Sequence, residues 1–271
     1  MSKRKSIFKN ASTTYFYSSL FFPKAVWEDV SILYAFVRVA DDFVDCVPQQ
    51  KEKFLQFRKD YEKALKKPVG NQIIDDFVVL GKKFGFEDSW TMSFLDAMES
   101  DLSTQKCKTI DETKTYMYGS AEVIGLYMAK ILHLDKKSYK SAKMQGRAMQ
   151  YINFLRDIAE DLDLGRIYVP ESVWREHGFK VFNKSEIFMR ADAFRKLMQS
   201  ELDRYESWQS EAVPGYKYIP WRYRVAIKTA SDMYSWTGKE IRKDPFRIFD
   251  EKIKPSKMRV FLNGLKNMLL I

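Results

Sequence analysis

Residues 34–45 have the sequence YAFVRVADDFVD, and this stretch decides the fold class of the chain. Apolar residues recur around it at helical spacing, so an α-helix is predicted over residues 24–45. Its polar residues recur at i, i+4, i+7 and i+11, a spacing that places them on one stripe of a helix. This stripe consists of Tyr34, Arg38, Asp41 and Asp45.

A second stretch, QYINFLRDIAED at residues 150–161, has the same organisation within a helix predicted over residues 135–162. Each stretch carries two aspartates four residues apart, late in a long apolar helix and with an arginine close by. The repeated pattern predicts that both pairs of aspartates face a common point. The second stripe consists of Gln150, Asn153, Asp157 and Asp161.

The four aspartates need a compensating charge. Carboxylates are costly to bury among apolar residues, and two facing pairs repel each other. Arg38 and Arg156 offset only part of that charge. Because magnesium prefers carboxylate oxygens and binds through few protein ligands plus substrate phosphates, the four aspartates are predicted to hold Mg²⁺, with Mn²⁺ as the alternative ion. The competing interpretation is that each DxxxD is a polar helix end.

The rest of the chain predicts an all-α fold in one domain, residues 1–271. Helical periodicity is nearly continuous, and only 11 glycines and 8 prolines interrupt it. No run alternates apolar and polar residues as a strand would, and no glycine-rich nucleotide loop is present. Helices are expected at 24–45, 49–66, 71–84, 88–102, 110–132, 135–162, 184–212, 217–238 and 254–271.

Composition narrows the function classes. The net charge of +10 favours anionic partners, but the lysines are scattered, so no nucleic-acid partner is expected. No apolar run reaches the length of a membrane span, and the N-terminus lacks the apolar region of a secretory signal. Cys46 and Cys107 cannot form a disulfide framework, which predicts a reduced, cytoplasmic setting. His133 and His177 are interpreted as structural or solvated, so any metal must be held by oxygen.

Four further stretches accompany the acidic ones: SxTY from Ser12, YGSAEVIG from Tyr118, GRIYVP ending at Pro170, and RIFDEK from Arg247. With them, nearly the whole chain resembles the squalene/phytoene synthase family, the head-to-head trans-isoprenyl diphosphate synthases. The resemblance implies an isoprenoid-synthase helical bundle around a central cavity. It also implies a prenyltransferase that condenses two prenyl diphosphates with Mg²⁺, through a cyclopropylcarbinyl diphosphate, to a 1-1′-linked hydrocarbon.

The same resemblance implies roles for individual residues. The four aspartates would hold magnesium, while Arg38 and Arg247 would grip diphosphate with Arg156 beside them. Tyr34 and Tyr118 would steady cations or phosphate, for which ordinary core packing is the alternative. Glu122 stands where many relatives have a small residue, and its role is left open. Substrate contacts are implied for Ser12, Thr14, Gln150, Asn153 and Tyr234.

The length of the substrate is predicted from two serines. Ser31 lies two turns below Arg38 on the same stripe, and Ser19 follows SxTY, so both are expected near the cavity floor. Small residues there leave room for longer tails, which favours two geranylgeranyl diphosphates and phytoene, without a requirement for NADPH. The alternative is two farnesyl diphosphates and dehydrosqualene or squalene.

The same fold also allows functions other than head-to-head condensation. A head-to-tail elongase usually carries DDxxD twice, whereas this chain has DDFVD and DIAED; a terpene cyclase and a non-catalytic relative are further alternatives. The final segment, KMRVFLNGLKNMLLI, is either an amphipathic foot for peripheral membrane contact or a packed terminal helix. The sequence makes no prediction about the oligomeric state.

Overall fold

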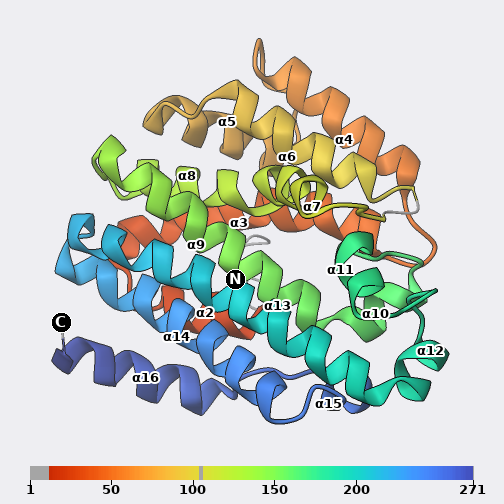
Figure 1. The fold of residues 1–271 in the computed structure, drawn as a ribbon. Coiled ribbons are helices and arrows are strands. Elements are labelled where there is room, and N and C mark those ends of the chain that lie inside the picture. The colour runs from red at the N-terminus through yellow and green to blue at the C-terminus, as the bar shows by residue number, and fades with distance from the viewer. Residues whose placement is uncertain (1–11, 104–105, 271) are drawn as a thin grey trace.

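The computed structural model describes residues 12–103 and 106–270. Helices make up most of these residues, and no β-strand occurs among them, only an isolated bridge between Lys106 and Ile167. The predicted all-α fold is therefore confirmed (Figure 1).

The α-helices of the described residues follow one another with short connections. Their bounds are α2 (Thr13–Ser19), α3 (Lys24–Asp45), α4 (Lys51–Ala64), α5 (Gln72–Phe84), α6 (Asp88–Ser100), α7 (Ile110–Met117), α8 (Val123–Ile131), α9 (Tyr139–Arg156), α10 (Ile158–Asp163), α11 (Glu171–Glu176), α12 (Lys184–Met189), α13 (Ala191–Ala212), α14 (Trp221–Lys243), α15 (Arg247–Asp250) and α16 (Lys257–Leu270).

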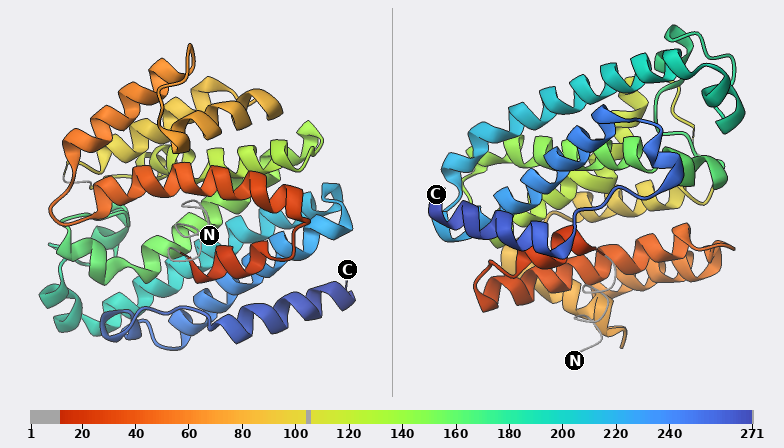
Figure 2. Two further views of the ribbon diagram at one scale, coloured as in Figure 1. Left: turned by 180° about the vertical axis from the view of Figure 1, so that it is seen from behind. Right: turned by 90° about the horizontal axis from the view of Figure 1, so that it is seen from below.

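The helices form a bundle with α9 at its centre. α9 packs against α8 on one side and against α13 and α14 on another, while α3 packs against α4, α5 and α6. Figure 1 shows α4 and α5 at the top, α9 across the middle and α16 along the bottom edge. Both views in Figure 2 show α16 at the outside of the bundle, where it packs against α2 and α14. This arrangement places the two predicted acidic helices, α3 and α9, in the middle of the bundle.

The hydrophobic core explains the orientation of α3. Phe36 is fully buried and stacks on Phe77 of α5, with 3.8 Å between ring centroids. Ala40 and Val44 are also fully buried. Since the apolar stripe of α3 faces this core, its polar stripe must face the other way.

Three helices that the sequence predicts as continuous are interrupted, and one of them, over residues 184–212, divides at Arg190 into α12 and α13. Residues 110–132 form α7, a π-helical turn at Tyr118–Glu122 and α8, and residues 135–162 break at Asp157, whose φ and ψ are −100° and 11°. The π-helical turn lies close to α6: a Cβ on Gly119 would stand 2.2 Å from the carbonyl oxygen of Ser93. Hydrophobic periodicity does not register one extra residue in a turn, so these breaks were not predicted.

Several short helices were also missed, because they are too short for periodicity to detect. α2 is one of them, and its N-cap is Ser12, whose hydroxyl accepts a hydrogen bond from Tyr15 N at 3.2 Å. Asn183 caps α12 in the same way. A Ser or Asn whose side-chain oxygen can accept a hydrogen bond from the backbone N–H three residues later is a sequence signal for the start of a helix.

Candidate active site

A cavity of about 680 Å³ lies inside the bundle, lined by α2, α3, the π-helical turn, α8, α9 and α14 and by the loop before α16. Along α3 its lining changes from Val30 and Leu33 to Asp41 and Asp45. At 1.5 Å per residue, that change takes place over roughly 22 Å. The cavity therefore has an apolar end and a charged end.

Most of the predicted site residues line this cavity, although they come from five separate helices. Their distribution along α3 and α9 follows the predicted stripes. They are Ser12, Thr14, Ser19, Tyr34, Arg38, Asp41, Asp45, Gln150, Asn153, Arg156, Asp157, Asp161 and Tyr234.

The first acidic motif combines one ion pair with an excess of negative charge. Arg38 Nη1 lies 2.7 Å from Asp41 Oδ2, and Arg38 Nη2 lies 2.5 Å from Asp42 Oδ1. Even so, burial and the neighbouring Asp45 raise the pKa of Asp41 to about 7. Arg38 therefore neutralises only part of the charge on this face of α3.

The second acidic motif is asymmetric. Burial alone would raise the pKa of Asp157, but Arg156 and Lys252 outweigh burial and lower it. Arg156 contacts both carboxylate oxygens, at 2.8 and 2.6 Å, and Lys252 Nζ lies 3.2 Å from Oδ1. Asp161 has no such ion pair among the described residues, and burial, followed by Asp157, raises its pKa to about 8.

The two motifs influence each other across the cavity. Besides Asp157, the carboxylates of Asp45 and Asp101 also raise the pKa of Asp161. Asp45 and Asp161 belong to α3 and α10, which are far apart in the sequence. This electrostatic coupling indicates that the charged end of the cavity brings both motifs to one place.

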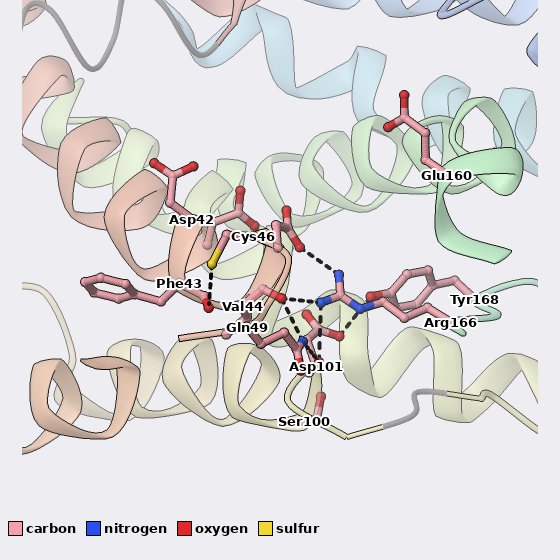
Figure 3. Close-up of polar contacts among 12 residues, drawn as sticks. Asp42, Phe43, Val44, Cys46, Gln49, Ser100, Asp101, Glu160, Arg166 and Tyr168 are labelled. Carbon is pink, nitrogen blue, oxygen red and sulfur yellow. Dashed lines mark hydrogen bonds and ion pairs between the residues drawn. The ribbon is translucent and has the colours of Figure 1, made fainter. Parts of the chain in front are cut away.

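A buried polar network, which sequence reasoning missed, connects the two motifs (Figure 3). Arg166, in GRIYVP, is 4% exposed, and its Nη1 lies 2.7 Å from Asp45 Oδ1. Its Nη2 donates to the carbonyl oxygen of Val44 at 2.6 Å and to that of Asp101 at 3.3 Å. Arg166 thus fixes the C-terminal end of α3 to the loop that follows the second motif.

Asp101 is the second missed member of this network. It is buried, and its carboxylate accepts hydrogen bonds from Tyr116 at 2.6 Å and Tyr168 at 2.8 Å. Burial raises the pKa of Asp101 to about 6, although these hydroxyls and Arg166 act in the opposite direction. The position of Arg166 in the GRIYVP stretch could have indicated its part in the site. No motif in the sequence contains Asp101, so nothing in the sequence pointed to it.

The donors at the charged end suit magnesium. They are carboxylate oxygens, and burial together with neighbouring negative charge raises the pKa values of Asp41 and Asp161; a divalent cation would compensate that charge. Within residues 12–103 and 106–270, no three acidic, histidine or cysteine side chains gather closely enough to hold an ion by themselves. Oxygens of a bound diphosphate would have to complete the coordination, as is usual for magnesium.

Cations gather beside the second motif. Arg156, Lys252 and Lys254 all line the charged end. The pKa of Lys254 is lowered by burial and then by the positive charges of Lys252 and Arg156, so the three cations lie close together. Such a cluster can bind an anion with several oxygens, and the two lysines were not predicted from the sequence.

Three tyrosines meet between the two ends of the cavity. The ring centroid of Tyr15 lies 6.4 Å from that of Tyr34 and 5.7 Å from that of Tyr234. Burial raises the pKa of all three, so they stay protonated at neutral pH. Nearby, the side-chain oxygen of Asn153 is buried without a hydrogen-bond partner in the described structure. The cluster offers aromatic faces and one unsatisfied acceptor to a ligand.

Three predicted site residues lie outside the cavity lining. Arg247 is 39% exposed and pairs with Glu240 at 3.2 Å and Glu251 at 2.6 Å on the surface. Tyr118 begins the π-helical turn, which turns Ser120 and Ala121 toward the cavity instead. Ser31 is buried, and its hydroxyl donates to the carbonyl oxygen of Glu28 at 2.7 Å.

Glu122, whose role the sequence left open, forms a buried ion pair. Glu122 is 2% exposed, and Arg147 of α9 contacts its Oε1 through Nε at 2.7 Å and Nη2 at 2.6 Å. The Arg147 guanidinium also lies over the ring of Trp208, 5.5 Å from its centroid. Glu122 therefore joins the π-helical turn to the centre of the bundle.

Comparison with known proteins agrees with this geometry. A family model described as Squalene/phytoene synthase matches residues 8–259. The chain is 25% identical over 248 residues to the 15-cis-phytoene synthase of Paracoccus sp. (strain N81106 / MBIC 01143), with 87% of this chain and 80% of that protein covered. It is 23% identical over 252 residues to the 4,4'-diapophytoene synthase of Staphylococcus haemolyticus (strain JCSC1435), with 90% and 88% covered.

The fold has a solved counterpart. A dehydrosqualene synthase crystallised in complex with a ligand superimposes with a TM-score of 0.85 at 23% sequence identity, and the match covers 98% of this chain and 94% of that one. The predicted isoprenoid-synthase bundle is confirmed by this likeness, together with the match of the family model across most of the sequence. The chain belongs to the squalene/phytoene synthase family.

Proposed function

We propose that this protein joins two molecules of geranylgeranyl diphosphate head to head to give phytoene, through a cyclopropylcarbinyl diphosphate. The observation that carries the proposal is the cavity itself, because its charged end suits diphosphate and its apolar end suits prenyl tails. Family membership makes the chain a prenyltransferase of the head-to-head type, and relatives named 15-cis-phytoene synthase support the C20 substrate.

Diphosphate binding is assigned to the charged end. Arg38, Arg156, Lys252 and Lys254 would donate hydrogen bonds to phosphate oxygens. For the first three, the ligand would replace their present carboxylate partners. Asp41, Asp45, Asp157 and Asp161 would hold magnesium there. When bound, magnesium would withdraw electron density from the diphosphate and so assist its departure.

The allylic cation that remains needs a polar but unreactive environment. The π faces of Tyr15, Tyr34 and Tyr234 would stabilise it electrostatically, and their raised pKa values keep the hydroxyls from ionising. Asn153 would orient the ligand through its unsatisfied oxygen. The closely packed apolar end would exclude water, which would otherwise capture the cation as an alcohol.

Small residues support the longer prenyl tail. The lining away from the charged end includes Gly125, Ala129, Ala142 and Gly146, which add little or no side-chain volume to the cavity wall. Ser19 also lines the cavity, and its hydroxyl accepts a hydrogen bond from Trp27 Nε1 at 3.0 Å. Ser31 adds no space for the prenyl tail, since it lies outside the cavity lining. Two farnesyl diphosphates remain the alternative substrates, with dehydrosqualene or squalene as the product.

The overall reaction to phytoene is redox-neutral, since two diphosphates and two protons leave while a double bond forms between the two C1 carbons. We therefore propose that NADPH is not required. We also propose that residues 1–271 act as one cytoplasmic domain, consistent with one core cluster from Phe22 to Ile253 and with two free cysteines. No helix of the described residues is both long enough and apolar enough to cross a membrane; peripheral contact is proposed, because the product is a hydrocarbon.

The test is an incubation with Mg²⁺ and either C15 or C20 diphosphate, with and without NADPH, followed by mass analysis of the hydrocarbons. The expected result is a C40 hydrocarbon from C20 diphosphate, in equal yield without NADPH. A C30 product from C15 diphosphate, with no turnover of C20, would overturn the chain length and leave the reaction type intact. Release of monomeric prenyl alcohols alone would contradict head-to-head condensation.

A further inference from the structure

The terminal helix α16 has an unusual distribution of residues. Its buried positions are Val260, Gly264 and Asn267, two of which carry little or no apolar surface. Its solvent-facing positions are apolar instead. The exposed apolar face of α16 consists of Met258 (68% exposed), Phe261 (52%), Leu262 (56%), Leu265 (40%), Met268 (54%), Leu269 (88%) and Leu270 (69%).

The buried side of α16 packs closely against the bundle, so the apolar face cannot turn inward without breaking these contacts. Asn267 donates to Asp232 Oδ2 at 2.9 Å and to Thr229 Oγ1 at 3.3 Å, both on α14. A Cβ on Gly264 would stand 2.0 Å from the ring of Phe21, which shows how closely this helix approaches its neighbours. Turning α16 over would break buried hydrogen bonds and would create a clash.

The charged side chains of α16 and of the segment before it have a single sign. From residue 252 to the end of the chain there is no Asp or Glu. On α16 itself, Lys257, Arg259 and Lys266 are exposed. An apolar stripe flanked only by basic residues complements the interface of a bilayer with anionic lipids, where the acyl boundary takes the leucines and the headgroups take the cations.

The face also lies near the cavity. α14 contributes Ala226, Ile227 and Ala230 to the cavity lining, while Thr229 and Asp232 of the same helix contact α16. Helix α14 therefore separates α16 from the cavity, and the apolar face lies on the outer side of α16. Pro255, two residues before α16, also lines the cavity.

We infer that the exposed apolar face of α16 docks the protein on the surface of an anionic lipid bilayer. The inference rests on the proposed function in one respect: a hydrocarbon product made in a protein docked on lipid can pass into the bilayer with little exposure to bulk water. The docking is peripheral, with the helix lying in the interface plane, and the bundle remains outside the hydrocarbon core.

The test is co-sedimentation of the full-length protein with phosphatidylcholine vesicles, with and without phosphatidylglycerol. The wild type is expected to bind the anionic vesicles and to be released by salt. Leu262→Ser combined with Leu269→Ser is expected to weaken this binding about tenfold or more, because both side chains are exposed and would insert. Lys257→Gln combined with Lys266→Gln is expected to weaken binding to anionic vesicles only.

The matched control is Val79→Ser combined with Met189→Ser, which removes exposed apolar side chains from α5 and α12 and is expected to leave binding unchanged. Wild-type binding that the leucine substitutions do not weaken would overturn the inference. So would a concentration-dependent dimer in sedimentation velocity that these substitutions dissociate, since a second copy would then cover the face.

Hydrocarbon synthesis is measured separately in detergent micelles, where docking is not needed. The leucine variant is expected to keep wild-type turnover there. Loss of vesicle binding with retained synthesis supports the docking surface. Absence of any product from the wild type, with vesicle binding intact, would instead contradict the proposed function and leave the surface standing.

Discussion

At the scale of single residues, the four aspartates of the two motifs are electrostatically unequal. Asp157 is held ionised by Arg156 and Lys252, while the pKa values of Asp41 and Asp161 rise to about 7 and about 8. In the absence of a ligand, the protein therefore has carboxylates that prefer a proton near neutral pH. A cation that binds there would replace that proton.

A first prediction concerns stability and pH. Because the folded-state pKa of Asp161 exceeds its ordinary 3.8, the folded protein binds more protons than the unfolded chain between about pH 4 and pH 8. Its stability should therefore fall as pH rises through that window when no metal is present. Asp161→Asn should raise the Tm at pH 8 by roughly 2–4 °C and leave it unchanged at pH 4, as measured by thermal denaturation in EDTA. A variant less stable than wild type at pH 8 would contradict the origin assigned to this pKa shift.

A second prediction concerns turnover. Asp41→Asn and Asp157→Asn should each lower kcat at least about a hundredfold, since each removes an anionic oxygen donor from the charged end. The far-UV circular dichroism spectrum should be unchanged. Asp192→Asn is the matched control, because this side chain is 96% exposed at the start of α13, and it should keep full activity. Normal turnover in either motif variant would remove the metal assignment.

At the scale of helices, close approach of backbones sets the shape of the cavity. A Cβ on Gly146 of α9 would stand 2.3 Å from the carbonyl oxygen of Ala121 in the π-helical turn, and one on Gly125 would stand 2.1 Å from that of Ala142. These contacts involve backbone atoms, which cannot move aside as a side chain can. The glycines therefore determine how near α8 and α9 come to each other, and they also line the cavity.

A third prediction compares two glycines inside helices. Gly146→Ala should lower the free energy of unfolding by about 2 kcal/mol or more, because the added methyl group would push the π-helical turn away from α9. Gly81→Ala, in the middle of α5, should raise it by about 0.5–1 kcal/mol, since its Cβ would make only ordinary contacts with Phe86, the nearest at 3.5 Å. Urea denaturation measures both. Equal effects of the two substitutions would refute the packing argument.

At the scale of the whole molecule, Arg166 joins segments that are distant in the sequence. It connects the loop after the second motif to Asp45 and Val44 at the end of α3 and to Asp101 at the end of α6. Each motif lies on its own helix, so their separation is set by such cross-connections rather than by either helix alone. Arg166 acts in this way as a positioning residue for Asp45.

A fourth prediction follows for Arg166→Met. The substitution should raise the Mg²⁺ concentration that gives half-maximal activity by about tenfold or more, because Asp45 loses the group that orients it. Arg166→Lys should not restore the wild-type value, since one ammonium group cannot reproduce the planar, forked set of contacts. Arg190→Met, which breaks a surface pair with Glu186, is the control. An unchanged Mg²⁺ requirement would show that Arg166 has only a structural role.

Local patterns in the sequence determined the fold class and identified several residues of the cavity lining. Period-3.6 apolar patterning on α3 and α9 requires one face to enter a core, and the polar residues on the opposite stripe follow from that. Tyr34, Arg38, Asp41 and Asp45 therefore share a face in the structure as their spacing predicts. Their roles in catalysis and in metal binding stay predictions.

Only the tertiary structure decided which residues distant in the sequence join them. Asp101, Arg166, Lys252 and Lys254 reach the charged end because α6, the loop after α10 and the loop before α16 converge there, and no spacing in the chain encodes such convergence. Arg247 and Ser31 do not line the cavity: Arg247 lies in the short helix α15 and pairs with Glu240 and Glu251 at the surface, while Ser31 is buried within α3. The apolar outer face of α16 likewise became visible only when its small and polar inner face was found docked against α2 and α14.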